Sequence, residues 1–140
     1  MAVVPNFHLN GKCKEAIDLY KKAFNAEVAC MLLYKDALAE DYNKPISDEQ
    51  KNYVYHAEIY IADQRIMLAD DIDYPFTPST ALFLTITMDT KEDVLRAFNI
   101  MKDGCTIVTP PHSTTYSSCI VNFIDRFGFR WVIMTEQTDR

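Results

Sequence analysis

The sequence repeats one order of secondary-structure signals twice within 140 residues. Each copy begins with a short apolar segment that predicts a strand, continues into one amphipathic helical segment, and ends with three further strand-like segments. The second copy begins after residue 80. One copy of such a unit cannot bury its apolar face alone, so the copies are expected to stack or pair and to build one site between them. The repeat therefore predicts a single domain made of two half-domains.

The first copy predicts strands at residues 2–9, 27–35, 53–62 and 65–70, with a helix after Asn10-Gly11. The apolar residues of that helix recur at spacings of three and four, as one buried stripe requires. They are Cys13, Ala16, Ile17, Tyr20, Ala23 and Phe24. Asn25 is expected to end the helix, because asparagine tolerates the left-handed conformation that follows many helices. Asp63-Gln64 is the predicted turn between the last two strands.

The second copy predicts strands at residues 81–88, 105–109, 115–124 and 129–136. Its helix follows Asp89-Thr90, where Thr90 and Asp93 form an acidic variant of a capping box. The buried stripe of this helix consists of Val94, Leu95, Phe98 and Met101. Gly104 ends the helix, and all three glycines of the chain lie at such junctions, where a positive φ or a tight reversal is needed.

Two segments interrupt the regular pattern. Residues 36–52 are polar and acidic, and a long connection of this kind is either a lid or a solvated loop. Within it, Ser47 and Gln50 are spaced to cap one short helical turn. The stretch before residue 81 is rich in Pro, Thr and Asp and reads as a linker. We therefore divide the chain into a module at residues 1–71, a linker at 72–80 and a second module at 81–140.

The composition narrows the classes of partner. A formal net charge of −6 argues against binding to nucleic acid or to an anionic membrane, because phosphate groups require a basic surface. No apolar run approaches the roughly 20 residues that a membrane span needs, and no leader pattern opens the sequence. We expect a cytoplasmic protein. The four scattered cysteines are expected to be reduced and mostly buried.

Three segments carry a family resemblance. Residues 11–27 (GKCKEAIDLYKKAFNAE) resemble the opening of the PhnB-like branch of the vicinal oxygen chelate superfamily, which also contains glyoxalases, extradiol dioxygenases and bleomycin-resistance proteins. His56-Ala57-Glu58, followed by residues 66–71 (IMLADD), resembles the central hairpin of that branch. Residues 125–131 (DRFGFRW) resemble its closing hairpin. The three segments occur in the right order and span nearly the whole chain.

The resemblance implies an α+β fold of two βαβββ modules, whose curved mixed sheets enclose a cleft, and it implies a homodimer. Two positions depart from the branch. Asn25 stands where glycine is usual, which is a harmless exchange. Tyr116-Ser117 stands where a Trp-Gly pair is usual, and this changes the expected shape of the pocket.

Metal-using members of the superfamily take one ligand, usually His or Glu, from the first and last strand of each module. The corresponding positions are Pro5 or Phe7, Met67, Phe83 and Val132. None of these side chains offers the imidazole or carboxylate that a divalent cation needs. An error of one residue in the alignment would bring His8 or Asp70 into place, and a larger one Glu136. We therefore expect no metal site and no cofactor.

His56 and Glu58 are the candidate catalytic residues. They alternate with Ala57, so both point to the same face of one strand, about 7 Å apart along it. A carboxylate in that position could orient and charge an imidazole for general acid or base chemistry. The alternative is structural, with His56 in a salt bridge or hydrogen bond on the sheet or at a dimer face.

The candidate ligand-binding residues are mostly aromatic: Tyr55, Tyr60, Tyr116, Arg130 and Trp131. Tyrosine lines pockets while keeping a hydroxyl for hydrogen bonding. Arg130 could receive an anionic ligand. Trp131, with Phe129 and Ile133 on one strand face, is either core packing or the aromatic wall of a ligand site.

The function that these observations favour is metal-free binding of a small organic molecule, with no reaction assigned. One alternative is a metal-dependent enzyme of the glyoxalase or dioxygenase type. The other is a protein of the bleomycin-resistance type, which sequesters a drug without turnover. A methyltransferase is not expected, because the sequence has no glycine-rich loop that could hold the nucleotide of a methyl donor.

Overall fold

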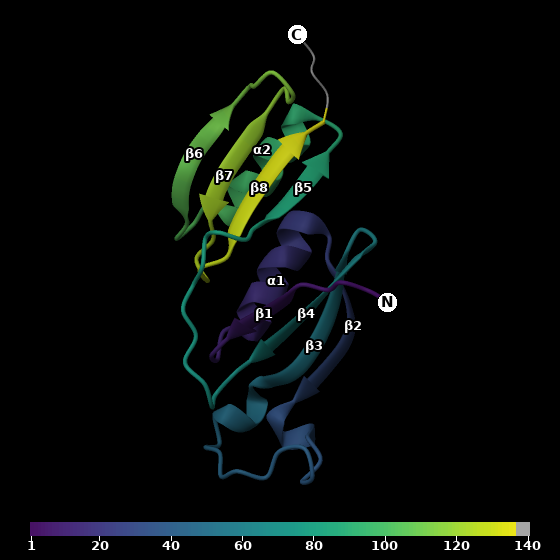
Figure 1. Cartoon of the computed structure of the whole chain (residues 1–140), viewed down its shortest axis with the longest axis vertical. Helices are drawn as coiled ribbons and strands as arrows, with labels where there is room; N and C mark the ends of the chain where they lie inside the picture. Colours follow the sequence, from purple (N-terminus) through teal and green to yellow (C-terminus); the bar gives the residue numbers. More distant parts are fainter. Residues whose placement is uncertain (137–140) are drawn as a thin grey trace. The chain divides into compact units, whose positions relative to one another are not determined.

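The chain forms two compact units, Met1–Phe76 and a second unit that begins at Thr77. The structure is a computed structural model that describes residues 1–136. Each unit contains one four-stranded sheet and one long helix (Figure 1). The α+β fold of two βαβββ modules is therefore confirmed.

The first module has the element order that the sequence predicts. It consists of β1 (Asn6–Leu9), α1 (Cys13–Phe24), β2 (Glu27–Leu33), β3 (Val54–Ile61) and β4 (Gln64–Asp70). The strands are ordered β1-β4-β3-β2 across the sheet, with β1 parallel to β4 and the other neighbours antiparallel. Two short 3-10 turns, Tyr34–Asp36 and Gln50–Asn52, lie between β2 and β3.

The second module has the same topology. It consists of β5 (Leu84–Met88), α2 (Lys91–Met101), β6 (Thr106–His112), β7 (Ile120–Ile124) and β8 (Arg130–Thr135). Its strand order is β5-β8-β7-β6, again with one parallel pair, β5 and β8. The repeat in the sequence is thus a repeat of one three-dimensional unit.

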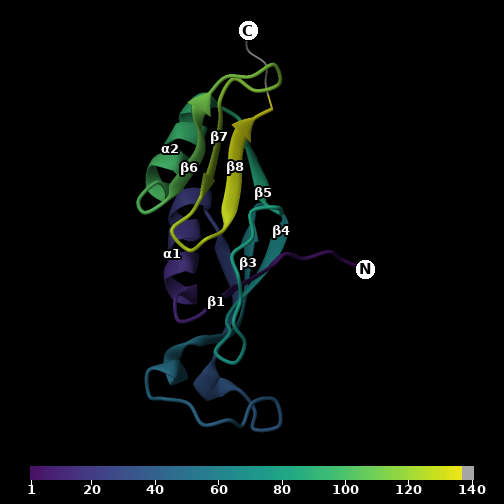
Figure 2. The same cartoon turned by 60° about the vertical axis from the view of Figure 1, so that its left-hand side comes forward.

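Each helix covers one face of the sheet of its own module (Figure 2). In the first module, the fully buried side chains on this face include Ile59, Ile66 and Leu68, and α1 contributes Ile17 and Tyr20. In the second module, the corresponding core contains Val121, Phe123, Trp131 and Ile133 from the sheet and Val94, Phe98 and Met101 from α2. Burial of these apolar side chains holds helix and sheet together. We call the other side of each sheet its open face.

The helix ends follow the predicted signals. Asn25 ends α1 with a φ of 55°, and its backbone N–H donates to the Tyr20 carbonyl. The hydroxyl of Thr90 caps α2 by accepting a hydrogen bond from the Asp93 backbone at 3.1 Å. Ser47 and Gln50 form the expected reciprocal pair of hydrogen bonds, at 3.0 and 3.1 Å.

Several predicted strand ends need correction. β1 begins at Asn6 rather than residue 2, and β5 begins at Leu84 rather than residue 81. The turn between β3 and β4 lies at Ala62-Asp63, one residue earlier than predicted. β7 begins at Ile120 rather than residue 115, because the residues before it fold onto the hydroxyl of Thr135 instead of pairing with a strand.

β6 is longer than predicted. It continues through Pro110 and Pro111 to His112, where the sequence predicts a loop. Proline cannot donate a hydrogen bond to a neighbouring strand, but β6 lies at the edge of its sheet, where one side of the strand needs no donor. His112 is exposed, and its Nδ1 lies 2.8 Å from the carbonyl oxygen of Pro110.

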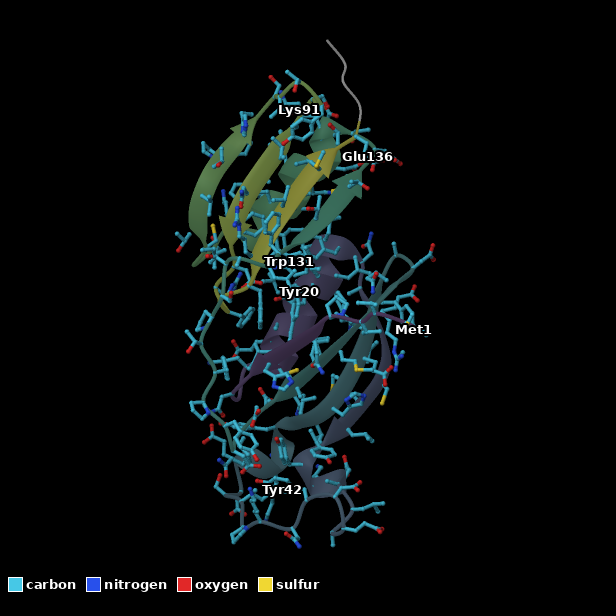
Figure 3. The ribbon with its side chains drawn as sticks, in the orientation of Figure 1. Met1, Tyr20, Tyr42, Lys91, Trp131 and Glu136 are labelled. Atoms are coloured by element: carbon cyan, nitrogen blue, oxygen red, sulfur yellow. The ribbon has the colours of Figure 1, made fainter. Side chains whose placement is uncertain are left out.

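The long loop at residues 36–52 is fastened at its middle. The ring of Tyr42, labelled in Figure 3, packs against Tyr34 and Tyr55 with centroids 5.1 and 6.4 Å apart. The Tyr42 hydroxyl donates a hydrogen bond to Asp73 at 3.1 Å. Residues 1–136 contain no helix that is both long enough and apolar enough to cross a membrane.

Candidate functional site

The open face of the first module combines a polar centre with apolar surroundings. Side chains alternate along a strand, so the residues between the buried positions of β3 and β4 point away from α1. On these strands they are His56, Glu58, Tyr60, Arg65, Met67 and Ala69. The register places Cys30 beside Glu58 and Leu32 beside His56 on β2. The same face therefore offers charged groups and exposed apolar surface together.

Glu58 holds two cationic or potentially cationic partners at the centre of this face. Its Oε2 lies 2.8 Å from His56 Nε2, and its Oε1 accepts a hydrogen bond from Arg65 Nε at 2.5 Å. The hydrogen bond from Arg65, followed by that from His56, lowers the pKa of Glu58. The pKa of Arg65 is raised by the same contact with Glu58. Glu58 is thus an ionised group that orients its neighbours, rather than a free base.

His56 is the accessible member of this network. Its side chain is 35% exposed, against 20% for Glu58. Because Nε2 is taken by the carboxylate, the ring is fixed and Nδ1 is left, with no hydrogen-bond partner among residues 1–136. The two side chains share one face, as the alternation predicts, and they are in direct contact. Their part in binding or catalysis stays a prediction.

Of the three tyrosines predicted to line the site, the two on β3 lie on opposite faces. Tyr60 is 38% exposed and shares the open face with Glu58. Tyr55 lies on the other side of β3, where its ring packs against Tyr34 with centroids 5.3 Å apart. The structure therefore separates Tyr55 from His56 and assigns it to the aromatic cluster that fastens the long loop.

Asp70 has a structural role. The sequence indicates it only as a possible metal ligand. Its side chain is on the helix side of β4 and is 1% exposed. The carboxylate accepts hydrogen bonds from the backbone N–H groups of Gly11, Cys13 and Val54 at 2.7, 3.1 and 2.9 Å. It thereby joins the start of α1 to the start of β3. Burial, and then this carboxylate, raise the pKa of the Cys13 thiol.

Arg130 marks the open face of the second module. Its Nε donates to Asn122 Oδ1 at 3.0 Å, and its Nη1 donates to the Thr80 carbonyl at 2.8 Å. The guanidinium carbon lies 4.2 Å from the centroid of the Phe83 ring. The side chain is half-buried and is held by neutral groups.

The other two candidates in the second module lie elsewhere. Trp131, labelled in Figure 3, is fully buried, and its indole N–H donates to Asp125 Oδ2 at 2.9 Å. It occupies the helix side of β8 beside Phe123, so core packing explains this residue. Tyr116 is 55% exposed in the connection between β6 and β7. The structure does not bring Arg130, Trp131 and Tyr116 together on one face.

The donor groups do not fit a divalent cation. Phe7 points toward α1, where its ring contacts Tyr20, so the open-face positions of β1 are Asn6 and His8. His8 is 3.4 Å from Asp71, but its partner on β4 is Ala69, and the ligand positions expected on β4 and β8 carry Met67 and Val132. Residues 1–136 contain no group of three or more His, Cys, Asp or Glu side chains that could hold a metal ion.

Comparison with known proteins supports the fold. No family model and no curated protein matches the sequence. Among solved structures, protein PA1353 from Pseudomonas aeruginosa is similar over 99% of both chains, with 25% identity and a TM-score of 0.83. A PhnB protein from Bacillus cereus is similar over 96% of this chain and 99% of its own, with 24% identity and a TM-score of 0.76. The fosfomycin resistance protein FosX from Listeria monocytogenes is similar over 99% of this chain and 95% of its own, with 11% identity and a TM-score of 0.67.

Proposed function

We propose that this chain, which has the paired βαβββ fold of the vicinal oxygen chelate superfamily and PhnB-like structural neighbours, binds a small organic molecule on the open face of its first module. One observation carries the proposal. His56 is fixed by Glu58 through one ring nitrogen and has its other nitrogen, Nδ1, without a partner in residues 1–136.

The chemistry of His56 defines what a ligand would offer. If Nε2 donates its proton to the Glu58 carboxylate, Nδ1 is an acceptor for a ligand hydroxyl, amine or amide N–H. If the ring is protonated, Nδ1 is a donor. Arg65 holds the other carboxylate oxygen and so limits the movement of Glu58. A ring fixed in this way loses little conformational freedom when a ligand binds.

The surroundings favour a ligand with an apolar part. Leu32 is 43% exposed beside His56, and Met67 is half-buried beside Glu58. Exposed ion pairs contribute little to stability, so stability alone is a weak explanation for this network. Binding of a molecule with one polar donor and an apolar body fits both parts of the face. The geometry assigns no reaction, and we propose none.

We also propose that binding requires no metal, because the expected ligand positions carry Met67 and Val132. Elemental analysis of purified protein tests this point. We expect far less than one equivalent of Zn, Ni, Fe or Mn per chain. Stoichiometric metal that resists dialysis would instead favour the metal-dependent enzyme.

The binding proposal is tested by a thermal-shift screen of small metabolites, followed by titration of each hit against variants. His56→Ala should weaken binding by about tenfold or more, since a hydrogen bond to the ligand is lost. Its free energy of unfolding should stay within about 1 kcal/mol of wild type, as for other surface positions. His112→Ala is the matched control, because it removes an exposed imidazole from β6 and should leave the affinity unchanged. Lower stability with intact affinity in both His56→Ala and Glu58→Gln would show that the network is structural.

A further inference from the structure

Arg130 is held in one orientation by three neutral contacts within the second module. Asn122 and the carbonyl of Thr80 accept its Nε–H and Nη1–H, and the ring of Phe83 lies against the guanidinium plane. Asn122 is on β7, diagonally across the hairpin at the position that pairs with Val132, and Phe83 immediately precedes β5. The side chain is therefore fixed by β7 on one side and by the segment that leads into β5 on the other, which is unusual for a long cationic side chain near the surface.

These contacts leave the charge of Arg130 uncompensated. No carboxylate lies within 4.0 Å of its guanidinium in the part of the chain that the structure describes, and Nη2 makes no hydrogen bond there. Arg65, at the same place in the first module, donates its Nε–H to the carboxylate of Glu58 instead. The chain as a whole carries a formal net charge of −6, so a cation without a carboxylate partner is not explained by a shortage of acids.

We propose that Arg130 is the anchor of an anion site on the open face of the second module, and that the site takes the carboxylate of a small organic acid. A guanidinium presents paired N–H groups that match the two oxygens of a carboxylate. Because Nε and one Nη1–H are already used, the carboxylate binds at the end of the guanidinium, through Nη2 and the remaining Nη1–H.

The surroundings select an acid with an apolar body. Phe83 is 38% exposed beside the guanidinium, whereas Val132, the next residue on the same face of β8, is buried. The exposed ring of Phe83 is therefore the apolar surface that a ligand would meet. The aromatic ring also excludes water from one side of the charge, which strengthens its attraction to an anion. This inference does not depend on the role of His56, which lies on the sheet of the other module.

Titration with sodium benzoate tests the site, because benzoate joins a carboxylate to an apolar ring. The measurement is the NMR shift of the Arg130 Nε–Hε signal in 15N-labelled protein at constant ionic strength. We expect a saturable shift with benzoate and a response at least about tenfold weaker with benzamide, which has the same shape and no charge. Equal binding of the two compounds, or the absence of a saturable shift with benzoate, would overturn the proposal.

Two variants test whether the uncompensated charge of Arg130 binds the anion. Asn122→Asp places a carboxylate where Glu58 stands in the first module, and it should weaken benzoate binding by about tenfold or more by occupying the guanidinium. Arg130→Gln removes the cation and should abolish the saturable shifts of the neighbouring backbone amides. Arg126→Gln is the matched control, since Arg126 in the turn before β8 also lies near an aromatic ring, that of Phe127. Retained affinity in both Asn122→Asp and Arg130→Gln, or its loss in Arg126→Gln, would place the anion elsewhere.

Discussion

The two modules place an arginine at the same point of their sheets and give it opposite electrostatic environments. Arg65 and Arg130 each lie near the start of the last strand of a module and bond back to the preceding strand. The acceptor is the carboxylate of Glu58 in the first module and the amide of Asn122 in the second. The shared topology fixes where the guanidinium lies, and one neighbouring side chain decides whether its charge is available.

The modules also differ in how they use a buried carboxylate. Asp70 joins three backbone N–H groups from two segments that are distant in the sequence. Asp125 bonds to the turn that follows it, through the backbone N–H groups of Phe127 and Phe129, and to the indole of Trp131. The first carboxylate fastens a helix to a sheet, whereas the second shapes a hairpin.

The largest effect that we predict comes from removing these carboxylates. Asp70→Ala should lower the free energy of unfolding by about 3–5 kcal/mol, because buried N–H groups lose their acceptor. Asp125→Ala should cost about 2–3 kcal/mol, because the backbone N–H groups of Phe127 and Phe129 are only partly buried, although the indole of Trp131 is fully buried. Urea denaturation of both variants measures the difference. An equal loss in the two variants would remove this distinction between the modules.

The hairpin turns give the next prediction. Gly128 has a φ of +95°, and a side chain there would place its Cβ 3.3 Å from the Cβ of Pro78. Gly128→Val should therefore cost about 1–3 kcal/mol through backbone strain. Thermal unfolding measures this loss. An unchanged melting temperature would mean that the hairpin of the second module accepts a β-branched side chain at a positive φ without strain.

The corresponding turn of the first module should respond in the opposite direction. Ala62 has a φ of 51°, a conformation that disfavours any residue with a Cβ. Ala62→Gly should raise the free energy of unfolding by about 0.5 kcal/mol, because relief of the strain slightly exceeds the entropy cost of glycine. Chemical denaturation alongside Gly128→Val tests the pair. A destabilised Ala62→Gly variant would show that the methyl group makes a contact worth more than the strain.

The smallest effect concerns pH. The pKa of Glu58 is lowered in the folded protein, first by Arg65 and then by His56. Ionised Glu58 therefore stabilises the fold above its ordinary pKa of 4.5, and this contribution is lost as pH falls through the lowered value. Urea midpoints measured between pH 7 and pH 3 should fall less steeply for Glu58→Gln than for wild type. Identical slopes would show that the ion pairs persist in the unfolded chain or contribute nothing.

Much of the fold follows from the sequence, because each module contains all its own signals. The Asn25 ending and the Thr90 cap depend on residues a few positions apart, and both are confirmed. The predicted stripe of α2 needs one correction, because Leu95 is 38% exposed and Ala97 is buried instead. Alternation alone also places His56 and Glu58 on one face. The same rule separates Tyr55 from Tyr60, so the sequence already held the signal that they do not share a site.

The partner of Glu58 could not be predicted in the same way. A turn at Asp63-Gln64 would pair Ala62 with Arg65 and carry the guanidinium away from Glu58. The observed turn, one residue earlier, pairs Tyr60 with Arg65 and brings the two charges together. Asp70 was missed for a similar reason, since its three partners come from segments that meet only in the folded module. Contacts across strands depend on register, which local patterns leave open.

The prolines of β6 have a consequence for self-association. An edge strand can act as a template for a strand from another chain, and this is a common start of aggregation. Pro110 and Pro111 lack the N–H groups that such a template needs, so this end of β6 resists strand addition. β2, the corresponding edge of the first sheet, contains no proline and exposes Val28, Met31 and Leu32. During folding or storage at high concentration, β2 is therefore more open to strand addition than the proline end of β6.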